Sequence, residues 1–136
     1  MSRAARYPLV DVTVCMDEMR YWFSAPSRSI NEVIRIYEKL GRPKNESEAR
    51  DFVLQEIRRL QPGNFVQSVV QWGDSQCVAD VYGALIEGQP WYIKFRIDEE
   101  GWLEQISFHP PAHALMTQSG SVIPAGGSID EKQKVR

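Results

Sequence analysis

The second half of the chain decides the fold, and it reads FVQSVVQW (65–72), QCVADVYGALI (76–86), WYIKFRI (91–97) and WLEQISFH (102–109). These four segments are rich in β-branched and aromatic residues, and short stretches with Gly, Pro or Asp separate them, which is typical of strands joined by turns. Connections this short favour antiparallel neighbours. Pro110-Pro111 ends the last segment, because proline cannot continue a hydrogen-bonded ladder. The sequence therefore predicts a four-stranded antiparallel meander.

The third segment has the clearest alternation of apolar and polar residues. Successive side chains of a strand point to opposite faces, so one face carries apolar residues and the other a phenol and two cations. The apolar set is Trp91, Ile93, Phe95 and Ile97, and the polar set is Tyr92, Lys94 and Arg96. We expect the apolar face to cover a core and the polar face to be open to water.

Two amphipathic helices are predicted before the strands. The first spans about 29–40, where Ser29 and Glu32 form a capping-box pattern. The second spans about 47–60, with Asn45 and Glu48 as a second cap pair. Apolar residues at helical spacing give each segment one stripe that can pack on the sheet.

The N-terminal region is harder to assign. Residues 8–16 alternate enough to be a further strand, and 16–23 fit either a short helix or an extended arm. We therefore predict an α+β fold with two helices on one face of a four-stranded antiparallel sheet, or of a five- or six-stranded one if extra strands join. Residues 1–125 are expected to form one domain and 126–136 a mobile C-terminal tail.

Composition indicates an ordinary globular protein rather than a membrane or disulfide-rich one. Hydrophobic residues make up 43% and charged residues 25% of the chain, and no apolar run is long enough for a transmembrane helix. Asp11 interrupts the N-terminal apolar stretch, so we expect no signal peptide and a cytoplasmic location. Cys15 and Cys77 lie in apolar segments, which favours two buried free thiols over a disulfide or redox pair.

The charge distribution argues against a general nucleic-acid binder. Residues 65–129 hold only two cations, Lys94 and Arg96, against seven carboxylates. A basic stripe is the usual mark of proteins that bind nucleic acid through their overall field. Any binding of a polyanion must therefore use a small local patch.

Such a patch is expected where the last two strands pair. If Ile106 and Phe108 face the core, Ser107 and His109 join Tyr92, Lys94 and Arg96 on the open face. A histidine titrates near neutral pH and suits proton transfer. We predict His109 and Tyr92 as catalytic residues, and Lys94 and Arg96 as phosphate-binding residues that stabilise charge in a transition state. Weaker candidates for the edge of this phosphate-binding site are Gln71 and Tyr82.

Simpler interpretations of the same residues stay open. The Tyr-Lys-Arg alternation is also what a plain solvated strand face looks like, and a histidine before Pro-Pro can be structural. Asp80 is expected either to form a buried ion pair with Lys94 or Arg96 or to be exposed. His109 and His113 lie four residues apart, but the intervening prolines deny them a helix, so no metal and no cofactor are expected.

Residues between Phe65 and His109 resemble those of the MqsR family of bacterial toxins, which are mRNA interferases with a RelE-like fold. The matching positions are F-x-x-S (Phe65, Ser68), Asp74, D-V-Y (Asp80, Val81, Tyr82), Y-I-K (Tyr92, Ile93, Lys94) and S-F (Ser107, Phe108). Tyr92 matches the catalytic tyrosine of that family. Gln67, Ala79 and His109 stand where the family has a lysine, a glutamine and a lysine.

The resemblance implies metal-independent endonuclease action on mRNA by attack of the ribose 2′-hydroxyl, as in a type II toxin–antitoxin system. It also implies an RNA substrate and a cognate antitoxin protein as partners, and it leaves a homodimer open. The alternative is a non-catalytic relative that binds RNA, a ribosome or a protein partner through the open sheet face. No interaction with a membrane is expected.

Overall fold

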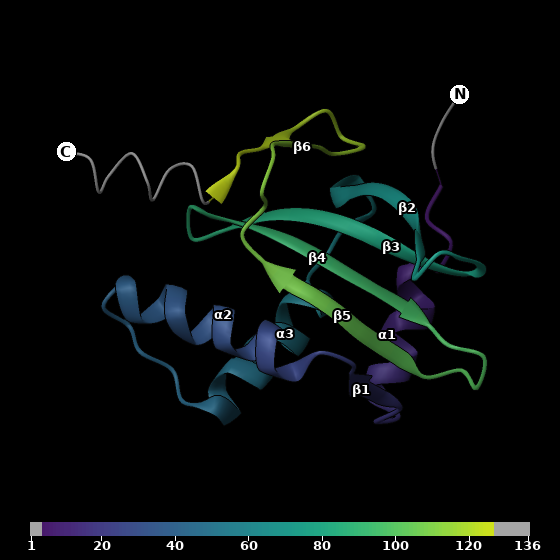
Figure 1. Cartoon of the computed structure of the whole chain (residues 1–136), viewed down its shortest axis with the longest axis horizontal. Coiled ribbons are helices and arrows are strands. Elements are labelled where there is room, and N and C mark those ends of the chain that lie inside the picture. The colour runs from purple at the N-terminus through teal and green to yellow at the C-terminus, as the bar shows by residue number, and fades with distance from the viewer. Residues whose placement is uncertain (1–3, 127–136) are drawn as a thin grey trace.

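The computed structural model of the chain describes residues 4–126. In this part of the chain, three α-helices and a 3-10 turn combine with seven strands (Figure 1). The order along the chain is α1 (Leu9–Asp17), β1 (Tyr21–Phe23), α2 (Pro26–Lys39), α3 (Glu46–Arg58), η1 (Pro62–Asn64), β2 (Phe65–Gln71), β3 (Asp74–Ile86), β4 (Gln89–Ile97), β5 (Leu103–His109), β6 (Leu115–Met116) and β7 (Val122–Ile123).

The main sheet has five strands in the order β1-β5-β4-β3-β2. Strands β2 to β5 lie where the sequence predicts strands, and each pairs antiparallel with the next. Strand β1 adds to the outer edge of β5 in parallel, with Tyr21 opposite Leu103. The α+β class is thus confirmed, but the sheet is mixed rather than antiparallel, and a second, two-stranded sheet of β6 and β7 accompanies it.

The predicted strand at 8–16 is wrong, because Leu9–Asp17 forms helix α1. The alternation of valines suggested a strand, yet Val12, Cys15 and Met16 are the buried residues of this segment. That spacing of three and four residues is the period of one helix face. Packing of this face on the core therefore overrides the β propensity of the valines.

Helices α2 and α3 lie close to the predicted ranges but start differently. At α3 the predicted capping box is present: Asn45 Oδ1 accepts from Glu48 N at 2.8 Å and Glu48 Oε1 accepts from Asn45 N at 2.9 Å. At α2 the predicted Ser29–Glu32 box is absent, because the helix begins one turn earlier at Pro26. Proline suits the first helical position, where its missing N–H would have no intrahelical partner.

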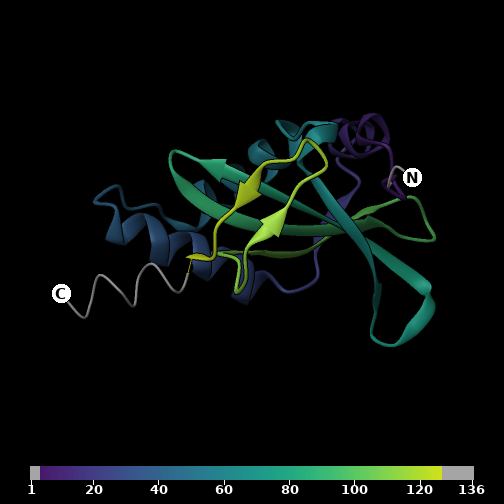
Figure 2. The same ribbon diagram turned by 90° about the horizontal axis from the view of Figure 1, so that it is seen from above.

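The helices cover one face of the sheet and form the core with it (Figures 1 and 2). As predicted, Trp91, Ile93 and Phe95 of β4 are fully buried against helical residues such as Val33 and Val53. Both cysteines are buried free thiols, also as predicted. Among residues 4–126, no helix combines the length and apolar character that crossing a bilayer requires.

The segment after β5 folds back over the other face of the sheet, which we call the open face (Figure 2). A Cβ added to Gly83 of β3 would meet Ile123 Cγ1 at 3.0 Å and Leu115 Cδ1 at 3.1 Å, so the β6–β7 hairpin packs directly on this strand. Gly126 N donates to Pro111 O at 2.9 Å and closes the segment into a loop. Of the tail predicted at 126–136, all but Gly126 lies outside the described residues.

A bulge in β5 sets which of its side chains reach the open face. Lys94 lies opposite Ser107, but the next residue, Phe95, lies opposite Gln105, so Ile106 is the extra residue. Such an insertion re-aims the side chains that follow it. Ile106 and Phe108 are both buried, as expected, but only Phe108 joins the core cluster beneath the helices, and Ile106 is buried outside it.

Candidate functional site

Strands β4 and β5 bring the two predicted catalytic residues together. Tyr92 lies opposite His109 in the register, and their rings stack with centroids 4.9 Å apart and planes 12° from parallel. Burial raises the pKa of the Tyr92 phenol, so this side chain keeps its proton at neutral pH. Tyr92 therefore fixes the plane of the imidazole, and as a neutral phenol it can donate a proton or a hydrogen bond but does not act as a base.

The backbone orients His109 and determines which ring nitrogen carries the proton. His109 Nδ1 lies 2.8 Å from Pro110 O, and a carbonyl oxygen can only accept a hydrogen bond. In the neutral ring the proton is therefore on Nδ1, which leaves Nε2 with its lone pair. Nε2 has no hydrogen-bond partner among residues 4–126, so it can take a proton from a ligand.

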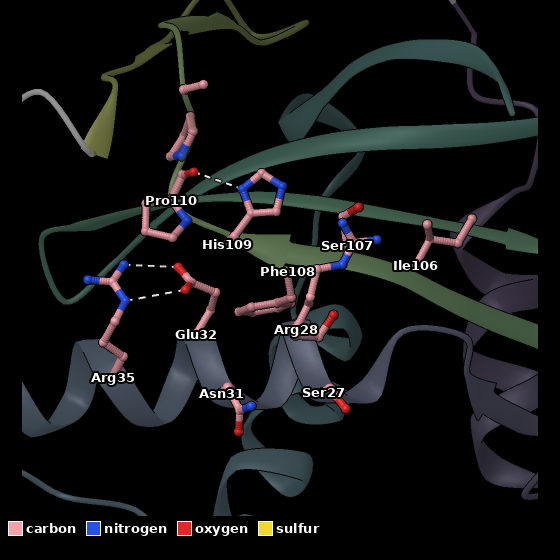
Figure 3. Close-up of a pocket in the computed structure, with 13 residues that line it drawn as sticks. Ser27, Arg28, Asn31, Glu32, Arg35, Ile106, Ser107, Phe108, His109 and Pro110 are labelled. Carbon is pink, nitrogen blue, oxygen red and sulfur yellow. Dashed lines mark hydrogen bonds and ion pairs between the residues drawn. The ribbon is translucent and has the colours of Figure 1, made fainter. Parts of the chain in front are cut away.

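Two cations lie next to this histidine. Lys94 faces the open side opposite Ser107, and Figure 3 shows Arg28 reaching from α2 across to Ser107. Burial lowers the pKa of Lys94, and the positive charge of Arg28 lowers it further. In the described part of the chain neither cation has a carboxylate partner. Two close, uncompensated positive charges make a favourable place for an anion such as phosphate.

A cavity of about 530 Å³ opens beside these groups, between the first half of α2 and the end of β5 (Figure 3). Strand β1 pairs only with Leu103–Gln105. In the described part of the chain, the rest of β5 therefore has no neighbouring strand at the edge that faces away from β4. His109 and Arg28 lie at the cavity wall together with Glu32 and Arg35 of α2. Arg35 Nε and Nη2 bind the two Glu32 oxygens at 3.2 and 2.9 Å.

Arg96 lies further along β4 in a different environment. It is only 9% exposed, its Nε donates to Glu104 Oε1 at 2.7 Å and its Nη1 to Glu99 Oε2 at 3.2 Å. Its guanidinium also lies 6.0 Å from the centre of the Trp72 ring. Two carboxylates thus compensate the charge that we predicted would bind phosphate.

The two weaker candidates do not join the site. Tyr82 is 1% exposed and belongs to the core, where it stacks on Phe95 with 5.3 Å between ring centroids. Tyr82 lies on the opposite face of the sheet from Tyr92, so the prediction that it lines the edge of the site is wrong. Gln71 is buried and pairs with Asp74, at the far end of β3 from Gly83, which is the partner of Tyr92.

Asp80 takes neither of its two expected roles. It is fully buried, but its carboxylate accepts from Arg6 N at 3.0 Å, from Tyr7 N at 2.9 Å and from Ser68 Oγ at 2.6 Å. These bonds anchor the N-terminal segment to the sheet. Among the described residues, neither Lys94 nor Arg96 forms an ion pair with it.

Arg28 is the site residue that sequence reasoning missed. A cation in the first turn of a helix normally indicates a solvated position, and only the packing of α2 beside β5 brings it to Lys94. Gln67 is exposed and shares one row across the sheet with Val81, Lys94 and Ser107. Position 67, where the resemblance would place a lysine, is therefore two strands away from Lys94.

No protein-family model matches the chain, and no curated protein is significantly similar to it.

Proposed function

We propose that the protein is an endoribonuclease of the kind found in bacterial type II toxin–antitoxin systems, a divergent MqsR-like toxin with a RelE-like fold, which cleaves mRNA by metal-independent acid–base catalysis. The observation that carries the proposal is the stacked His109–Tyr92 pair beside two cations, Lys94 and Arg28. The partial match to the family between Phe65 and His109 supports it.

The chemistry follows from the position of each group. His109 Nε2 takes the proton of a ribose 2′-hydroxyl, whose oxygen attacks the adjacent phosphorus while the bond to the 5′-oxygen breaks. Lys94 and Arg28 stabilise the negative charge on the non-bridging oxygens. The leaving 5′-oxygen receives a proton from the imidazolium or from the Tyr92 phenol. The products are a 2′,3′-cyclic phosphate and a 5′-hydroxyl.

The test compares the wild-type chain with His109→Ala and Tyr92→Phe on a defined RNA. General acid–base catalysis contributes roughly 10²–10⁴-fold, so we expect His109→Ala to lose about that factor in cleavage rate. His113→Ala is the matched control, because His113 is exposed and does not line the cavity. Intact RNA with the purified wild-type protein and normal growth on its expression would contradict the proposal.

A second candidate is a non-catalytic relative that binds RNA, a ribosome or a protein partner through the same face. Gln67 and Ala79 favour it, because they occupy positions where the family has a lysine and a glutamine. Retention of intact RNA by the wild-type protein, weakened in Lys94→Ala, is the result expected of this candidate.

The proposal also includes partner proteins and a cellular location. A toxin of this kind acts on mRNA in the cytoplasm and is neutralised by a cognate antitoxin, and it can form a homodimer. A small DNA-binding protein encoded in the adjacent reading frame is the expected antitoxin. Co-expression of the two chains should restore growth.

A further inference from the structure

The cavity beside His109 has a size and lining of its own. Its volume of about 530 Å³ is in the range of roughly 300–1,000 Å³ typical of small-molecule sites. That is enough for a nucleobase and its sugar but far too little for an oligonucleotide. Whatever enters it must therefore be one unit of a longer substrate or a small ligand.

The walls combine an apolar slot with a polar end. Ile106, Pro110 and Pro111 supply branched or flat apolar surface, and Glu32, which points from α2 toward β5, supplies a hydrogen-bonding carboxylate. The two bonds from Arg35 hold the Glu32 carboxylate in one orientation. A fixed carboxylate at the end of an apolar slot suits an aromatic ligand that carries N–H donors on its edge.

The position of the cavity links it to the reacting groups. His109 and Arg28 belong to its wall, so a phosphate held by Arg28 and Lys94 lies at its entrance. A nucleotide joined to that phosphate can place its base in the slot without leaving the site.

We infer that this cavity selects the base next to the cleaved phosphate, and that Glu32 reads the edge of that base. The inference rests on the proposed ribonuclease function. A carboxylate accepts from the amino group of guanine, cytosine or adenine, whereas the N3–H of uracil lies between two carbonyl oxygens that the carboxylate repels. The cavity therefore disfavours uracil at one position flanking the cleaved bond.

The experiment maps cleavage positions on a long RNA of mixed sequence by sequencing the 5′-hydroxyl ends. Wild type should show uracil depleted at one flanking position. One base-edge contact gives roughly 1–3 kcal/mol of discrimination, and each 1.4 kcal/mol is tenfold, so Glu32→Gln should reduce the depletion about tenfold. Glu32→Ala should remove the preference at the same position. Glu38→Gln is the matched control, since Glu38 lies on the same helix outside the cavity.

The outcomes separate the two proposals. Absence of cleavage by wild type overturns the ribonuclease function and this inference with it. Cleavage with a random flanking base, or with a preference that both Glu32→Gln and Glu32→Ala leave intact, overturns only the inference. Thermal unfolding of each variant identifies one that fails to fold, in which case the other decides.

Discussion

Lys94 holds a positive charge where the fold itself gains nothing from it. The side chain is partly buried, its pKa is lowered by burial and by Arg28, and it has no carboxylate partner among the described residues. An unpaired charge that is partly buried destabilises the fold, and such charges are characteristic of functional sites.

Replacement of Lys94 by methionine, which has a similar length and no charge, should therefore stabilise the fold by about 0.5–1 kcal/mol while it weakens the RNA binding proposed above. Because the pKa of Lys94 is lowered in the folded state, the unfolded chain binds more protons between that lowered pKa and the ordinary value of 10.5. Stability of the wild type should rise with pH across this window, and its deficit relative to Lys94→Met should shrink there. Urea titrations at several pH values measure the difference in stability between the two proteins and its change with pH.

Lys44→Met is the contrasting variant. The Lys44 ammonium lies over the Tyr37 ring at 4.5 Å and over the Phe52 ring at 5.2 Å, so its loss should lower stability. A destabilised Lys94→Met variant would contradict the functional interpretation of that charge.

Sequence alternation correctly placed Tyr92, Lys94 and His109 on one surface, because a strand's period depends only on local geometry. The environment of Arg96 could not be predicted in the same way. It depends on Glu104, which reaches the open face only because the bulge at Ile106 shifts the register of β5. Arg28 likewise needs the packing of α2, which no local pattern specifies.

At the scale of elements, one of the two capping boxes predicted from the sequence is present, at α3, and the other is absent, at α2. The stability of two variants measures this difference. Asn45→Ala removes a real cap and should cost about 1 kcal/mol. Ser29 lies inside α2, and its buried Oγ has no hydrogen-bond partner in the described region. Ser29→Ala should therefore be neutral or stabilising, since it removes an unsatisfied polar atom. Thermal unfolding of both variants would contradict these assignments if the two lose stability equally.

The β6–β7 hairpin depends on the absence of a side chain at Gly83. In Gly83→Ala the new Cβ crowds Ile123 and Leu115 at 3.0 and 3.1 Å, and overpacking of this kind typically costs about 1–3 kcal/mol. Leu115→Ala in the same chain removes one of the colliding groups and should recover part of the loss. Hydrogen exchange at Thr117, whose N–H donates to Ser121 O, reports on the hairpin directly.

Helix α1 shows why element type can be misread from a short segment. Val10, Val12 and Val14 alternate as a strand would, while Leu9, Val12 and Met16 also fit one side of a helix. Over nine residues both periods fit, and Val10 and Val14 are exposed at 68% and 40%. Packing against the core, rather than the sequence of the segment, decides whether it forms a helix or a strand.

At the scale of the whole molecule, the N-terminal segment is held by one buried carboxylate. Asp80→Asn leaves a single side-chain oxygen for three donors, from Arg6, Tyr7 and Ser68. Hydrogen bonds to charged groups contribute about 1.5–3 kcal/mol each, so residues 4–8 should detach and become sensitive to protease. Ser68→Ala, which removes one donor and leaves the backbone bonds, should be much milder. Equal proteolysis of both variants would argue against this anchor.

The parallel pairing of β1 with β5 has a consequence for how the protein is made. Tyr21 must find Leu103, and Arg6 and Tyr7 must find Asp80, so these residues wait for partners that leave the ribosome much later. Helices α2 and α3 can form early, but their apolar faces have no sheet to cover until β5 has emerged. During synthesis the chain therefore passes through a stage in which the core is exposed and the surface that carries Tyr92 and His109 is incomplete, and both are completed only after β5 has emerged.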